Sequence, residues 1–240
     1  MERMRICLVT PALASANNGN WHTASRWARV LSGDYPVSVV AHWSGQPADL
    51  MIALHARRSA PSIAAWAALR PRRPLAVVLT GTDLYRDIDI DAQAQASLAL
   101  ADRLVVLNEL GASRLAAPLR QNVTTCLQSA TTRRTLPKSR ARLRVLMVGH
   151  LRAEKDPATF MAAADALAAR RDVLFDHVGA ALEPALGEQA RALAARQPGY
   201  RWFGALPPGP TRARIQRAHV LVQASRMEGG AHTVIEAVAS

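Results

Sequence analysis

The sequence predicts an α/β protein in which strands and helices alternate along the whole chain, in two successive domains. The strand-like segments are continuously apolar, as in "LAVVLT" (75–80) and "RLVVLN" (103–108). Such runs are typical of strands buried on both faces of a parallel sheet. The alternation stops at 130–142, a polar, basic and proline-bearing stretch, and then restarts. These observations predict two doubly wound α/β layers joined by a linker, with domains at 1–135 and 136–240.

Each predicted element rests on its own residues. In the first domain, apolar runs predict strands, and capped or amphipathic runs predict helices. The predicted strands are 5–11, 37–43, 49–56, 75–80, 103–108 and 123–128. The predicted helices include 20–33 and 59–70. The same patterns predict the elements of the second domain; its strands are 143–150, 173–179, 200–206 and 219–225, and its helices are 157–170, 184–197, 209–217 and one that begins near Ala231. Ligands of such folds bind outside the carboxyl ends of the strands.

Composition narrows the function. The chain has 240 residues, half of them apolar, and a net charge of +12. No run reaches the ~20 apolar residues of a membrane helix, and the N-terminus shows no signal peptide, so we expect a cytoplasmic protein. The positive charge suits nucleic acid or small anionic substrates. Because no aromatic platform or recognition helix accompanies the scattered arginines, we expect small anions and no nucleic acid. Cys7 and Cys126 lie in strand-like runs and predict buried free thiols, without metal-ligand spacing.

Three polar clusters follow strands of the first domain. The loop "PALASANNGNWH" (11–22) contains Gly19 and leads into a helix that we expect Asn20 to cap. Such a loop either binds an anion at the helix N-terminus or is an ordinary strand–helix connection. Adjacent Arg57 and Arg58 suit a phosphate-type anion, or are a solvated pair.

The third cluster is "LTGTDLYRD" (79–87), where Thr80, Asp83 and Arg86 share one loop. Asp83 suits either the orientation of a hydroxyl group or a helix cap.

Two further clusters lie in the second domain. His150, Arg152 and Lys155 follow its first strand in "VGHLRAEKDP" (148–157), and Lys155 is one of only two lysines in an arginine-rich chain. Three potential cations at a strand end indicate a diphosphate clamp or a basic loop.

The closing stretch "SRMEGGAHTVIEAVAS" places Glu228 before Gly229 and Gly230, with Glu236 about two helical turns later. These carboxylates suit substrate hydroxyls, and the alternative is a capped surface helix with a solvated glutamate.

The segments "GHLRAEK" and "EGGAHTVIE" resemble two motifs of the family-four retaining glycosyltransferases. The resemblance implies a GT-B fold, which has two Rossmann-like domains facing a cleft. It implies that Glu228 holds the donor sugar and Glu236 the donor ribose. It also implies that Lys155 stabilises the leaving diphosphate and that Gly19 approaches it, with no metal or other cofactor. His150 stands where the family has an arginine, which makes Arg152 a candidate substitute.

A narrower resemblance comes from "LHARRS", "TGTDLYRD", "GHLRAEKDP" and "SRMEGGA", which are similar to the selenosugar synthases of selenoneine biosynthesis. It implies that selenophosphate is joined to a UDP-sugar, UDP-N-acetylglucosamine in the family picture, with release of UDP and phosphate. Thr80 replaces a histidine that the wider family uses towards hydroxyl acceptors. An acceptor that is already anionic needs positioning more than proton removal. Arg57, Arg58 and Arg86 are the expected acceptor clamp.

Family members continue past the helix that carries Glu236, so we expect the second domain to be truncated at its C-terminus. Two other functions stay open on the sequence alone. One is a family-four glycosyltransferase that uses a hydroxyl acceptor, and the other is a basic, non-enzymatic nucleic-acid-binding protein.

Overall fold

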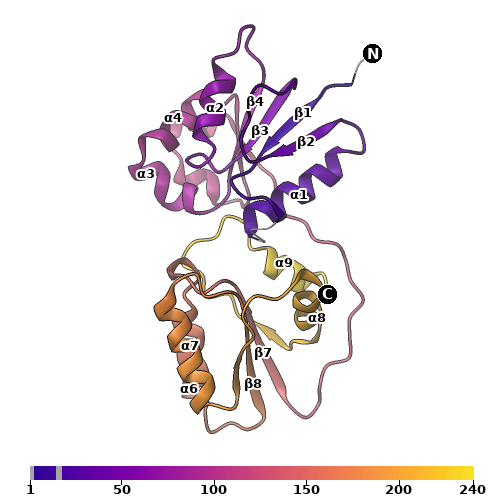
Figure 1. Ribbon diagram of the computed structural model, residues 1–240, viewed down its shortest axis with the longest axis vertical. Helices are drawn as coiled ribbons and strands as arrows, with labels where there is room; N and C mark the ends of the chain where they lie inside the picture. The colour runs from indigo at the N-terminus through magenta and orange to yellow at the C-terminus, as the bar shows by residue number, and fades with distance from the viewer. Residues whose placement is uncertain (1–2, 15–17) are drawn as a thin grey trace. The chain divides into compact units, whose positions relative to one another are not determined.

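The computed structural model describes residues 3–14 and 18–240 and divides the chain into two compact units (Figure 1). The first unit comprises Met1–Gln128 together with Glu228–Gly230, and the second comprises Ser129–Met227 together with Ala231–Ser240. Residues 126–142 form neither helix nor strand. None of the helices in the described part of the chain is long and apolar enough to cross a membrane.

A six-stranded parallel sheet forms the centre of the first unit, with strand order β2-β1-β3-β4-β5-β6. Its strands are β1 (Ile6–Val9), β2 (Val37–Val40), β3 (Leu50–Leu54), β4 (Leu75–Leu79), β5 (Arg103–Val106) and β6 (Val123–Thr125). All four residues of β1 are buried, whereas the edge strands β2 and β6 are only partly buried. Continuous apolar runs therefore do belong to strands covered on both faces.

Helices cover both faces of this sheet. Alternate strand residues point to opposite sides, so Ile6 and Leu8 pack with α1 while Cys7 and Val9 pack in the cluster that holds α2 and α4. The helices are α1 (Gly19–Leu31), α2 (Ala60–Ala67), α3 (Ile88–Ile90), α4 (Ala92–Leu100) and α5 (Ala117–Arg120), with a π-helical turn at Asp83–Asp87 and a 3₁₀ turn at Gly111–Arg114.

The second unit contains a four-stranded parallel sheet with the order β10-β7-β8-β9. Its strands are β7 (Leu143–Val148), β8 (Val173–Val178), β9 (Tyr200–Trp202) and β10 (Val220–Leu221). Its helices are α6 (Pro157–Ala166), α7 (Pro184–Arg196), α8 (Pro208–Arg217) and α9 (His232–Val238), with a 3₁₀ turn at Ala153–Lys155. Residues of α6 and α7 pack on one face of the sheet, whereas residues of α8 and α9 pack in a cluster on the other.

Two local predictions are wrong. Asn20 does not cap α1: Asn18 has the extended backbone that a cap requires, and its Oδ1 accepts from the Trp21 amide at 3.2 Å, so Asn20 lies inside the first turn. Cys126 is exposed because it follows the short edge strand β6, whereas Cys7 is buried in the central strand β1. Burial raises the pKa of the Cys7 thiol.

Candidate functional site

The carboxylate of Asp83 ties together the loops that follow β3 and β4. Its Oδ1 accepts from the Thr80 and Gly81 amides, each at 2.9 Å, and its Oδ2 accepts from the Ala56 amide at 3.0 Å. Asp83 is fully buried. Hydrogen bonds of this kind are strengthened by the charge of the acceptor. Asp83 therefore fixes the backbone of the "TGTD" loop, and it does so from inside the first turn rather than as a helix cap.

His55 lies beside this loop and was not singled out from the sequence. It follows β3 with a φ of +72°, which side-chain-bearing residues rarely adopt, and it is buried. Its Nδ1 accepts from the Arg58 amide at 3.3 Å, so the proton of the neutral ring is on Nε2, 3.1 Å from Thr82 Oγ1. Burial lowers the pKa of His55, although Asp83 and Asp87 oppose the shift. The neutral imidazole therefore orients the Thr82 hydroxyl.

The three arginines expected to hold the acceptor have different partners. Arg57 Nε lies 3.2 Å from Asp87 Oδ2, and Arg86 Nε lies 3.0 Å from Asp87 Oδ1. Both arginine side chains are about 40% exposed, while the Asp87 side chain is 1% exposed. Arg58 is exposed and has no ion pair among the described residues. Asp87, also missed from the sequence, therefore partly neutralises two of the three cations.

The first predicted loop can be described only in part. Residues 15–17 of the stretch 11–22 lie outside the described residues. Gly19 is the first residue of α1, and a Cβ on it would meet no atom of the described residues within 4 Å. Asn20 follows it in the first turn, so both lie at the amino end of this 13-residue helix.

In the second unit, a loop at the carboxyl end of β7 carries His150, Arg152 and Lys155. The Ala180 amide donates to His150 Nδ1 at 3.1 Å, so that ring is neutral in this arrangement and does not act as a cation. Arg152 precedes the turn Ala153–Lys155 that ends on Lys155. The positive charge of the predicted clamp therefore comes from Arg152 and Lys155.

One glycine, Gly179, lets this loop lie close to the sheet. At Gly149 a Cβ would make only ordinary van der Waals contact, 3.6–3.8 Å from the aliphatic carbons of Lys155. Gly179, with a φ of +157°, would clash with the Gly149 carbonyl if it carried a Cβ. Glu183 Oε1 accepts from the Ala153 amide at 2.7 Å and braces the turn. Close backbone packing therefore fixes the position of the turn that carries Lys155 relative to the carboxyl end of β7.

The closing motif is divided between the two units. Glu236 lies in α9 of the second unit, where its Oε1 is 3.4 Å from Arg212 Nε of α8. Glu228, Gly229 and Gly230 are grouped with the first unit, in which Asn108 Nδ2 donates to the Gly229 carbonyl at 2.8 Å. The Glu236–Arg212 pair was not predicted from the sequence. Across the described ranges, no group of three or more His, Cys, Asp or Glu side chains could hold a metal ion.

The architecture, an α/β fold with parallel sheets, is that of the GT-B glycosyltransferases. The chain is similar to TarM of S. aureus, solved with fondaparinux, α-GlcNAc-glycerol and UDP, at 13% identity over 80% of this chain and 39% of that one, with a TM-score of 0.63. HepE of Anabaena, solved with UDP and glucose, is 15% identical over 98% of this chain and 78% of the HepE chain, with a TM-score of 0.63. The lipopolysaccharide outer core galactosyltransferase WaaB is 13% identical over 98% of this chain and 78% of the WaaB chain, with a TM-score of 0.66.

Sequence comparison adds a family for the second half of the chain. Residues 128–240 match the family model described as glycosyl transferases group 1. The matched segment contains Lys155 and both glutamates of the closing motif. Among curated proteins, none matches the sequence. The chain spans 39% of the length of the TarM chain.

Proposed function

We propose that the protein is a group 1 glycosyltransferase that transfers a sugar from a UDP-sugar, with selenophosphate as the acceptor. The observation that carries the donor half is the family match over 128–240, which includes the loop of Arg152 and Lys155 at the carboxyl end of β7. Ligands of parallel α/β sheets bind at that end of the strands. TarM and HepE were both solved with UDP, which supports the choice of nucleotide.

On the donor side, charge on the leaving diphosphate would be stabilised by Lys155. The Lys155 ammonium would act where negative charge grows as the bond from the anomeric carbon to UDP breaks. Glu236 would accept from the ribose hydroxyls and Glu228 from those of the sugar. Arg212 Nε, 3.4 Å from Glu236 Oε1, would favour one orientation of this carboxylate towards the ribose.

On the acceptor side, the selenium of selenophosphate would form the bond to the anomeric carbon as UDP departs. Water would then cleave the Se–P bond, which yields the selenosugar and phosphate. Because the nucleophile arrives as an anion, the site needs cations rather than a base. Arg58 is exposed and unpaired among the described residues, and Arg57 and Arg86 are half exposed, which supports their assignment to this anion.

The first test is a product assay with UDP-N-acetylglucosamine, with and without selenophosphate. We expect UDP release that depends on selenophosphate, together with a selenium-containing sugar detected by mass. Lys155→Met should lower kcat about 100-fold or more, since it removes a charge that acts on the leaving group. Lys138→Met is the matched control, because Lys138 is exposed and is the only other lysine. Absence of UDP release with every acceptor would contradict the proposal.

The arginines test the acceptor half separately. Arg58→Ala should raise the KM for selenophosphate about tenfold, because one charge-assisted hydrogen bond contributes about 1.5–3 kcal/mol. The KM for the UDP-sugar should stay unchanged. Arg29→Ala, which removes an exposed arginine of α1, is the control. An unchanged KM for selenophosphate in an Arg57, Arg58 and Arg86 triple alanine variant would contradict this assignment.

A hydroxyl acceptor is the second candidate, and His55 favours it. A buried neutral histidine that orients Thr82 beside Thr80 would assist transfer to an alcohol. Turnover with a hydroxyl acceptor, and none with selenophosphate, would select this alternative and leave the donor assignments in place.

A further inference from the structure

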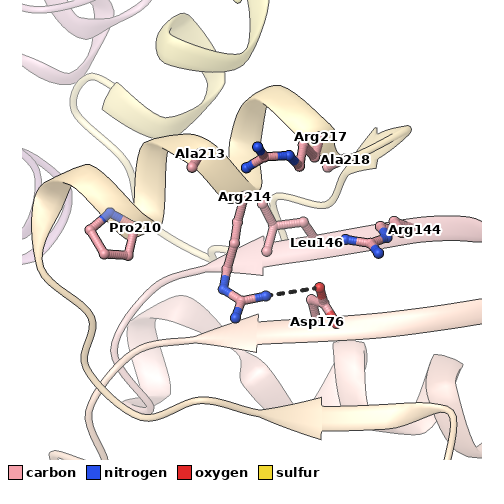
Figure 2. Close-up of a pocket in the computed structure, with 8 residues that line it drawn as sticks. All are labelled: Arg144, Leu146, Asp176, Pro210, Ala213, Arg214, Arg217 and Ala218. Carbon is pink, nitrogen blue, oxygen red and sulfur yellow. Dashed lines mark hydrogen bonds and ion pairs between the residues drawn. The ribbon is translucent and has the colours of Figure 1, made fainter. Parts of the chain in front are cut away.

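A second basic site lies in the second unit, at the amino half of β7 and remote along that strand from the loop of Lys155. A cavity of about 230 Å³ opens between the sheet and α8 (Figure 2). Arg144 and Leu146 of β7 and Asp176 of β8 line it from the sheet, while Arg214 and Arg217 line it from α8. None of these residues takes part in the proposed transfer reaction.

Asp176 is the only carboxylate that lines this cavity, and it is already paired twice. The Asp176 residue is 3% exposed. Arg201 of β9 donates to Oδ1 from Nε at 2.8 Å and from Nη2 at 2.5 Å, and Arg214 Nη1 lies 3.4 Å from Oδ2. Figure 2 shows Arg214 reaching from α8 down to this carboxylate. The Arg214 guanidinium also stacks on Phe203, 3.6 Å from the ring centroid.

The remaining two cations, Arg144 and Arg217, form no ion pair with any carboxylate in the described part of the chain. Arg144 Nε is a buried atom without a hydrogen-bond partner, and Arg217 has no ion pair among the described residues. Arg144, Arg201, Arg214 and Arg217 together carry four positive charges against the one negative charge of Asp176. Burial lowers the pKa of Arg214, and the positive charges of Arg201 and Arg144 lower it further. The negative charge of Asp176 acts in the opposite direction. Like charges held this close favour binding of an anion.

We propose that this cavity binds a small phosphate-bearing anion, such as phosphate or diphosphate, at a site separate from the donor loop. Guanidinium groups recognise phosphate oxygens bidentately, and Arg144, Arg214 and Arg217 approach the cavity from two elements. Pockets for drug-sized ligands measure about 300–1,000 Å³. The smaller volume here selects a single phosphate or diphosphate group over a whole nucleotide.

A competing explanation is that Arg214 and Arg217 only complement the dipole of α8, since both lie in its last turn. That explanation accounts for the position of these two residues on the helix. It does not account for Arg144, which is on the strand and has a buried Nε without a partner. The two explanations differ in the effect of a free anion on Arg144.

The test is a titration of the ¹⁵N-labelled 240-residue chain with inorganic pyrophosphate at constant ionic strength, followed by arginine Nε–H and backbone amide NMR signals. We expect saturable shifts at Arg144 and at residues 213–218, with a Kd below about 1 mM. Arg144→Gln/Arg217→Gln should weaken this binding tenfold or more. Arg140→Gln/Arg171→Gln removes two exposed arginines of the same unit and should change it less than twofold.

Two further experiments test where the anion binds and whether it comes from a lipid headgroup. Lys155→Met should leave the shifts at Arg144 intact, even if it abolishes the proposed glycosyltransferase activity, so the two proposals fail separately. Vesicles of phosphatidylglycerol and phosphatidylcholine serve as the lipid source of phosphate. Signals at Arg144 that respond to these vesicles but not to pyrophosphate would overturn the small-anion site. Linear, unsaturable shifts, or equal weakening in the control variant, would overturn it as well.

Discussion

Asp87 in the first unit and Asp176 in the second are two buried carboxylates, each flanked by two arginines. The side chains of these aspartates are 1% and 5% exposed. Arg57 reaches Asp87 from the loop after β3, and Arg86 reaches it from within the same π-helical turn. Arg201 and Arg214 reach Asp176 from β9 and α8. The same ion-pair arrangement is thus used once beside a strand-end loop and once on the face of a sheet.

The difference lies in what surrounds each triad. Around Asp87 the arginines are about 40% exposed, so each can turn to water if the carboxylate is lost. Around Asp176, Arg201 is 38% exposed, but Arg214 is 29% exposed and stacked on Phe203. Arg144, which has a buried Nε, lines the same cavity. Loss of the carboxylate is therefore expected to cost more stability in the second unit than in the first.

The largest expected effect comes from Asp176→Asn. It leaves Arg144, Arg201 and Arg214 close together without a counter-charge, and removal of one partner from a buried ion pair costs about 3–5 kcal/mol. Hydrogen exchange of the amides in β7 and β8 measures the stability of this unit. Asp172→Asn, which breaks the exposed pair with Arg170, is the control and should leave exchange unchanged. Equal protection in both variants would contradict this reading of Asp176.

The next effect is a loss of stability in acid, centred on His177. This histidine is fully buried and its Nδ1 is 2.8 Å from Tyr200 Oη; burial lowers its pKa from 6.5 to about 4. The unfolded chain binds a proton below pH 6.5 that the folded chain does not bind until about pH 4. Stability is therefore present above pH 6.5 and is lost as the pH falls, by about 2–3 kcal/mol at pH 4.5.

The measurement is the free energy of unfolding between pH 7 and pH 4.5 for three proteins. His177→Gln should show a shallower loss than the natural chain. His55→Gln should change the slope less, because Asp83 and Asp87 oppose the lowering of the His55 pKa. A larger change for His55 than for His177 would reverse this ranking.

The smallest effect is expected from Asp87→Asn, about 1–2 kcal/mol, since both arginines keep access to water and Asp91 Oδ2 lies 3.9 Å from Arg57. Thermal unfolding of the variant measures it. A loss as large as that of Asp176→Asn would show that exposure of the arginines does not decide the cost.

Much of the fold could be predicted, because apolar continuity reports burial on both faces. The run 173–179 predicts a strand, and all six residues of the observed β8, Val173–Val178, are buried. The run 219–225 was also assigned to a strand, but β10 is only Val220–Leu221. Its later residues include Gln223 and Ser225, which hydrogen-bond to each other at 2.7 Å rather than extending the sheet.

The candidate site could be predicted only at the level of loops. Strand-end clusters pointed to Arg57, Asp83 and Lys155, but partners chosen by tertiary packing gave no local signal. Asp176 is the instructive case, because a charged residue inside a buried strand requires a partner. That partner is Arg201, directly opposite in the register between β8 and β9. Such pairing requires knowledge of which strands are neighbours, which a single sequence does not contain.

The exposure of Cys126 gives the natural chain a built-in attachment point for a probe. A reagent can reach the exposed Cys126 thiol, whereas Cys7 is buried and that burial raises the pKa of its thiol. A maleimide dye should therefore modify a single position, directly after β6 and at the first residue of the long irregular segment that leads to β7. Substrates can then be added to a labelled protein that carries no mutation, and the change in dye emission at Cys126 can be measured directly.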